Sequence, residues 1–169
     1  AIAEGDYETA DKQINKIVAY INANNITELF DMRDCAQSWL HILTGNLDKV
    51  SNWVTSSDAY YPNAPIDTGR NIFVYAIHLF AKSEYEKTNK YLEQSEELFH
   101  QKSLWSLRVS FYLFRAICLL KLKESEKALV YFAKSYEMSY HNNIIMPFAE
   151  FGSDLYPVLD LAMNSKEYT

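Results

Sequence analysis

The sequence is poor in the residues that interrupt regular structure. Its 169 residues include only four glycines and four prolines, far fewer than low-complexity or collagen-like chains contain. It also has no uninterrupted apolar run of 18 residues, and its start lacks the charged, apolar and small-residue succession of a signal peptide. We therefore expect long elements joined by short loops, and no membrane-spanning segment.

Cysteines and clusters of basic residues are scarce as well. Cys35 and Cys118 lie far apart and form no CxxC pair, which argues against a disulfide framework and a zinc site. The formal net charge is −6 and no Lys/Arg cluster occurs, so we expect this chain to make no direct contact with nucleic acid. A reducing cytoplasm is the simplest location.

Motifs that carry catalysis are also missing. The chain contains no GxxxxGK[ST], GxGxxG, HExxH or GxSxG sequence. Its four histidines are separated by at least 22 residues, so no two of them lie on adjacent turns of one helix as metal ligands often do. Acidic pairs such as Glu96-Glu97 stand among lysines and indicate a solvated surface. We expect a binding protein without enzymatic activity, metal or cofactor.

The sequence does contain a repeat. Four turn-like segments begin at Gly5, Gly45, Ser83 and Lys123, at offsets of 40, 38 and 40 residues, and each leads into a helix-like pattern. Five residues after the starts come Ala10, Val50, Thr88 and Ala128, and nine residues after them come Ile14, Val54, Leu92 and Phe132. Seven residues before the last three starts come Ser38, Ala76 and Ala116. Small residues at fixed positions let paired helices approach closely.

This pattern predicts an all-α, tetratricopeptide-like α-solenoid of about eight antiparallel helices. We expect a single repeat domain over residues 1–169, itself a segment of a larger protein. Such stacks curve around a concave binding groove, although an ordinary globular helix bundle without a groove is the alternative. The helices are expected at residues 6–24, 27–44, 47–57, 67–82, 84–101, 104–122, 125–141 and 147–164.

Counting back from the turns identifies candidate groove residues. In a tetratricopeptide-like hairpin the first helix of each pair lines the concave wall, which selects five residues: Cys35, Trp39, Arg70, Phe73 and Ile77. Aromatic rings with an arginine nearby suit a peptide, a sugar or an aromatic metabolite. The same side chains also suit the packed core between helices.

Three arginines, Arg70, Arg108 and Arg115, are embedded in apolar helix sequence. A guanidinium that leaves water needs a partner. The packing interpretation is an internal salt bridge or a side chain that extends to the surface, and the functional interpretation is contact with a ligand or partner.

Several stretches together resemble the tetratricopeptide-like regulatory region of MalT-like, LuxR-type transcriptional activators of bacteria. They are Ser38-Trp39-Leu40 with the turn 45–50 and Trp53, the hairpin 75–87, the hairpin 116–129, and a closing element over 141–152 that contains Pro147-Phe148. The likeness covers roughly residues 30–164. Met146 and Phe151 depart from the family pattern, which favours a basic and an acidic residue there.

The resemblance implies a role in transcription regulation. Such regulators carry an N-terminal ATP-binding module and a C-terminal helix-turn-helix that binds DNA, and the helical repeats between them sense a signal. This chain would then be the cytoplasmic segment that binds a small-molecule effector or a regulatory protein. The alternative is a general tetratricopeptide scaffold that binds a partner peptide and has no transcriptional role.

Self-association is a further expectation. A solenoid cut at an internal repeat exposes an apolar face that its neighbour would cover. We expect any dimer to use the first helix, near Tyr7, Ile14, Ile17 and Ile21.

Overall fold

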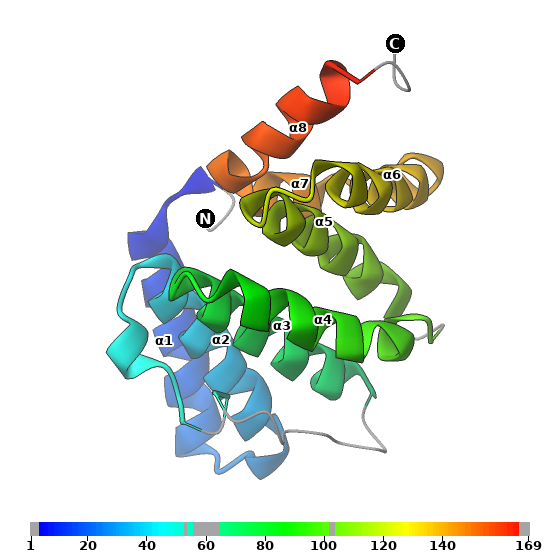
Figure 1. Cartoon of the computed structure of the whole chain (residues 1–169). Helices are drawn as coiled ribbons and strands as arrows, with labels where there is room; N and C mark the ends of the chain where they lie inside the picture. The colour runs from blue at the N-terminus through cyan, green and yellow to red at the C-terminus, as the bar shows by residue number, and fades with distance from the viewer. Residues whose placement is uncertain (1–3, 53, 56–64, 102–103, 166–169) are drawn as a thin grey trace. The chain divides into compact units, whose positions relative to one another are not determined.

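The computed structural model describes residues 4–52, 54–55, 65–101 and 104–165. Its contacts group the chain into two compact units, residues 1–83 and residues 84–169. One repeat domain over the whole chain stays a prediction. Within the described residues the chain is all-α, with eight α-helices and no strand (Figure 1), as the sequence predicts.

Unit 1 contains three α-helices. These are α1 (Tyr7–Ala23), α2 (Phe30–Leu43) and α3 (Pro65–Ala81), with short 3₁₀ turns at Thr27–Leu29 and Leu47–Lys49. The helix α1 begins where the Asp6 side chain accepts a hydrogen bond of 3.0 Å from the Thr9 backbone N–H, an N-cap that lowers the pKa of Asp6. The helix α2 contacts both α1 and α3.

Unit 2 is built around one buried helix. Its α-helices are α4 (Tyr85–Phe99), α5 (Trp105–Lys121), α6 (Ser125–Asn142), α7 (Met146–Glu150) and α8 (Tyr156–Met163). The helix α5 contacts all four of the others and lies alongside α6 as a hairpin (Figure 1). Nearly every residue from Val109 to Leu119 is buried, which explains why the α5 sequence is apolar on all sides.

The four predicted turn starts share one backbone conformation. Gly5, Gly45, Ser83 and Lys123 all have positive φ, between 60° and 76°. After α2, Gly45 N–H donates to Ile42 C=O and Asn46 N–H to His41 C=O; after α5, Lys123 and Glu124 make the same two bonds. This is the Schellman ending of a helix, in which a left-handed residue lets the next N–H groups satisfy the last free carbonyls. The predicted repeat of turns is confirmed.

The predicted small residues are buried as well. Ser38, Ala76 and Ala116 are each at most 1% exposed, and Thr88 and Ala128 are fully buried. A larger side chain at such a position would push the adjoining helix away. The tetratricopeptide type of the repeat stays a prediction.

One predicted helix, over residues 47–57, is wrong. The described part forms only the 3₁₀ turn Leu47–Lys49, after which Val50 is extended with φ −66° and ψ 131°. The Ser38 hydroxyl accepts a hydrogen bond of 3.2 Å from the Ser51 backbone N–H, which is therefore engaged outside a helix. The segment is also rich in Asn, Ser, Thr and Val, all poor helix formers. Trp53 and residues 56–64 lie outside the described residues.

The predicted final helix over 147–164 is interrupted. It consists of α7, a 3₁₀ turn at Gly152–Asp154, and α8. Gly152 has φ +49°, a conformation that an α-helix does not contain, and Pro157 at the start of α8 has no N–H for a helical hydrogen bond. The other predicted helices agree with the structure within a few residues.

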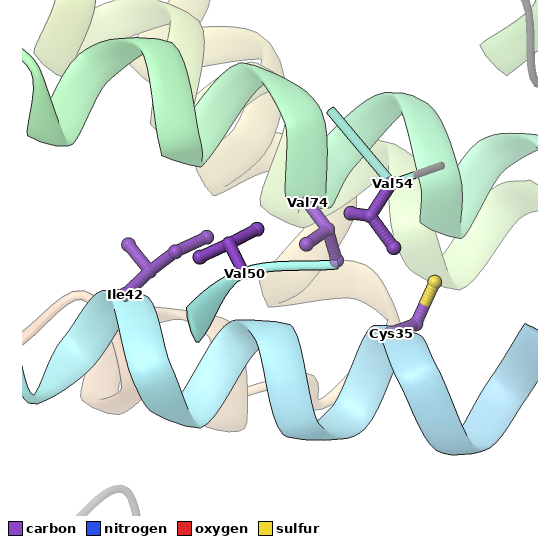
Figure 2. Packing of buried hydrophobic residues seen from close by; sticks show 5 residues of the cluster. All are labelled: Cys35, Ile42, Val50, Val54 and Val74. Carbon is purple, nitrogen blue, oxygen red and sulfur yellow. The ribbon is translucent and has the colours of Figure 1, made fainter. Parts of the chain in front are cut away.

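An apolar cluster fills the interior of unit 1. Figure 2 shows Cys35 and Ile42 of α2, Val74 of α3, and Val50 and Val54 of the irregular segment with their side chains turned toward one another. Val54 is only 1% exposed. The segment after Gly45 therefore keeps the burial that the repeat predicts, although it does not keep the helix.

Candidate functional site

The five predicted groove residues all lie on α2 and α3 of unit 1. Trp39 and Phe73 are in contact, with ring centroids 5.7 Å apart, and Trp39 and Ile77 are half-buried against the apolar cluster. Phe73 is 3% exposed and Cys35 is 6% exposed. The structure thus brings these four residues together as the packing between two helices. Their role in a groove stays a prediction.

Polar groups also meet within this packing. The Cys35 thiol donates a hydrogen bond of 2.7 Å to Oδ1 of Asn71, which is 3% exposed. Arg70, one residue before Asn71 on α3, is half-buried. A neutral bond inside an apolar cluster holds two helices in register.

A buried polar network joins three helices of unit 2. Arg115 of α5 is 4% exposed and forms ion pairs with Glu96 and Glu93 of α4, the second at 3.5 Å. Its guanidinium lies 4.3 Å from the ring centroid of Tyr131 on α6. Tyr131 in turn donates a hydrogen bond of 2.9 Å to Glu96. For Arg115 the internal salt bridge predicted as the packing interpretation is confirmed.

Burial in and beside this network raises the pKa of two groups. Burial, followed by the hydrogen bond to Glu96, raises the pKa of Tyr131 to about 12. Burial also raises the pKa of the Cys118 thiol to about 12. Both groups are therefore neutral at physiological pH, and neither is an activated nucleophile. We assign the network to the cohesion of α4, α5 and α6.

Arg108 has a structural partner too. Its side chain donates to the backbone C=O of Phe99 and, at 3.1 Å, to that of Gln101. Phe99 is the last residue of α4, where carbonyl groups have no partner within the helix and a cation is favourable. Arg108 thus caps α4.

A surface hollow of about 620 Å³ lies at the end of α6 and the start of α7. We call it the α6–α7 hollow. Such a volume is typical of ligand sites, which are mainly apolar with a few placed polar groups. Its lining residues are Tyr136, Ser139, Tyr140, His141, Asn143, Ile144, Ile145 and Phe148.

The aromatic wall of the α6–α7 hollow follows from the helical repeat of α6. Phe132, Tyr136 and Tyr140 are spaced four residues apart, so they form one stripe along the helix. Their rings stack in sequence, with centroids 6.3 Å and then 6.1 Å apart. Phe148 of α7 meets Phe132 edge-on at 6.4 Å. The contact between Phe132 and Phe148 joins the two helices that form the hollow.

One buried polar group in the α6–α7 hollow lacks a partner. Ser139 is 6% exposed, and its Oγ forms no hydrogen bond within the described part of the chain. One turn earlier, Ser135 Oγ donates a hydrogen bond of 3.1 Å to the backbone C=O of Val109. An unpaired buried hydroxyl costs about 1–3 kcal/mol. Because the Oγ atom itself is buried, a ligand in the hollow can form a hydrogen bond with it only after the Ser139 side chain rotates.

The lining residues of the α6–α7 hollow include no Asp, Glu, Lys or Arg. Across the described residues, no group of three or more His, Cys, Asp and Glu side chains is placed to hold a metal ion. The side chains available at the hollow are aromatic rings, aliphatic groups, three hydroxyls, an imidazole and an amide. These groups are suited to recognising an apolar surface.

The α6–α7 hollow is not predicted from the sequence. Of its lining residues, only those from His141 onward fall within the predicted closing element of the repeat array, residues 141–152. The signal was present in the four-residue spacing of Phe132, Tyr136 and Tyr140. The spacing alone does not show whether the stripe is exposed or buried, because that depends on which helices pack against α6.

Comparisons with protein-family models, with curated proteins and with solved structures gave no match. Among the described helices, none combines the length and the apolar character needed to cross a bilayer.

Proposed function

We propose that this chain is a helical-repeat binding domain that senses an effector or a protein partner for a LuxR-type transcriptional regulator. The observation that carries the proposal is the regular series of left-handed turns at Gly5, Gly45, Ser83 and Lys123, with small buried residues at fixed offsets. The resemblance of residues 30–164 to MalT-like regulatory regions supplies the link to transcription. A cytoplasmic location belongs to the same proposal.

The α6–α7 hollow is the proposed binding surface. Tyr140 is 70% exposed and Ile145 is 75% exposed there, and exposed aromatic and aliphatic side chains grouped together mark interaction sites. In the mechanism, the bound partner has different affinities for the active and inactive forms of the regulator. Only such a difference shifts the equilibrium between the two forms.

A reporter assay in the regulator that carries this chain tests the proposal. We expect Tyr140→Asp and Ile145→Asp to change signal-dependent transcription at least about tenfold, the effect of roughly 1.4 kcal/mol of coupling. Tyr20→Asp on α1 is the matched control, because Tyr20 is 64% exposed and lies in the other unit. Unchanged regulation in both hollow variants, with normal protein levels, would exclude this surface.

The general scaffold remains the second candidate, since an uncharged aromatic hollow also suits a partner peptide outside transcription. Sequencing the gene beyond both ends of the chain separates the two candidates. A helix-turn-helix downstream supports the regulator, whereas further helical repeats without a DNA-binding domain support the scaffold.

A further inference from the structure

We infer that the occupant of the α6–α7 hollow is a second copy of this chain, so that the hollow forms half of a two-fold symmetric dimer interface. The inference rests on the proposed function in taking the hollow as a binding surface. It goes further by naming the partner.

The openness of the α6–α7 hollow favours a macromolecule over a small molecule. Sites for small molecules enclose most of the ligand surface, whereas the walls here are open. Tyr136, Tyr140, Ile145 and the adjoining Met146 are 50%, 70%, 75% and 58% exposed. A broad partner surface covers such side chains, but a small ligand leaves most of them in water.

The exposed area matches a weak dimer. If each fully exposed side chain of this size presents about 200 Å², these four residues together expose about 500 Å². A symmetric pair would bury about 1,000 Å², which is near the lower limit for a specific interface. The expected product is a reversible dimer with a dissociation constant in the micromolar range.

Charge does not oppose a second copy at this place. The chain carries a net charge of −6, but no Asp, Glu, Lys or Arg side chain lines the α6–α7 hollow. Two acidic chains can therefore meet here at a low electrostatic cost.

Two-fold symmetry gives Ser139 the partner that it lacks. In a symmetric interface, each contact from one copy is returned by the other. Once the Ser139 side chain rotates toward the α6–α7 hollow, a tyrosine hydroxyl from the second copy can donate to its Oγ or accept from it. Because both hollows are occupied at once, the assembly closes as a dimer and does not extend into a filament.

Sedimentation velocity on the chain, from about 5 to about 500 µM, tests the inference over the range expected for a small interface. We expect monomer at the low end and dimer at the high end. Tyr140→Glu should raise the dissociation constant at least about tenfold, because it buries a charge without a partner. Ser139→Ala should raise it about two- to tenfold without lowering the melting temperature of the monomer, since the removal of an unpaired buried hydroxyl relieves its desolvation cost.

Tyr20→Glu provides the matched control, with a similarly exposed tyrosine on α1. A chain that stays monomeric at every concentration overturns the inference. So does a dimer that Tyr140→Glu leaves intact and Tyr20→Glu dissociates, which would assign the interface to α1. A monomeric chain whose Tyr140→Asp variant still alters transcription refutes the dimer and keeps the proposed function. A dimer that forms through the hollow, together with unchanged transcription in the Tyr140→Asp variant, keeps the dimer and refutes the proposed function.

Discussion

The two units differ in the polar groups that are buried between their helices. In unit 1, α2 and α3 meet through the apolar cluster of Figure 2 and a neutral hydrogen bond between Cys35 and Asn71. In unit 2, α4, α5 and α6 meet around the guanidinium of Arg115, which pairs with Glu96 and lies over Tyr131.

The two interiors are expected to lose stability in different ways when a buried side chain is substituted. An apolar cluster loses stability in proportion to the atoms removed and the cavity that they leave. A buried ion pair behaves in another way, because removal of one partner leaves the other charged and poorly solvated. Unit 2 is therefore expected to be more sensitive to a single substitution of its central residue.

The largest expected effect is that of Arg115→Ala. It leaves Glu96, whose side chain is 21% exposed, without its main partner, and we expect the free energy of unfolding to fall by about 3–5 kcal/mol. Urea denaturation followed by circular dichroism measures the loss. Lys87→Ala removes an exposed pair with Glu84 and should cost less than about 1 kcal/mol. Equal effects of the two variants would contradict a structural role for the network.

Phe73→Ala tests the apolar interior of unit 1. We expect a loss of about 3 kcal/mol, at the lower end of the range for a buried aromatic ring, because the half-buried Trp39 beside it can partly relax into the space. Ile17→Ala on α1, where the side chain is 55% exposed, should change stability by less than about 0.5 kcal/mol. Unchanged stability of Phe73→Ala would restore Phe73 as a free groove residue.

Two turn residues, one in each unit, allow a paired test in which the expected change in stability is smaller. Lys123 has φ +64° and Gly45 has φ +76°, and a side chain in this region costs about 1–2 kcal/mol. Lys123→Gly should therefore stabilise the chain by about 0.5–1 kcal/mol, whereas Gly45→Ala should destabilise it by about 1 kcal/mol. Thermal unfolding measures both.

Glu126→Gly on the exposed side of α6 is the control for the turn variants, with an expected loss of about 1 kcal/mol. If Lys123→Gly destabilises the chain as much as this control does, the left-handed turn is not the reason for its effect.

The sequence predicted the helices that have both an ending signal and a continuous apolar pattern. The helices α5 and α6, for example, were expected at 104–122 and 125–141 and are observed at Trp105–Lys121 and Ser125–Asn142. The turn positions were predicted because similar turn-like segments recur at offsets of 40, 38 and 40 residues. Burial of Ser38, Ala76 and Ala116 was predicted because their spacing relative to the turns is constant.

Local sequence patterns did not predict two features of the structure. The turn at Gly45 has the same hydrogen bonds as the turn at Lys123, yet only the second leads into a helix. The difference lies in the poor helix formers that follow Gly45 and in the bond between Ser51 and Ser38. The α6–α7 hollow was missed because the exposure of Tyr136 and Tyr140 depends on which neighbours cover α6.

The most direct test of the central claim, that two copies of the chain bind each other through the α6–α7 hollow, is a concentration series of NMR spectra on the unmodified protein. We predict that methyl signals of Ile144 and Ile145 and ring signals of Tyr136 and Tyr140 shift as the concentration rises, while the signals of Ile17 and Tyr20 on α1 stay in place. Shifts confined to α1, or no shift at millimolar concentration, would contradict it.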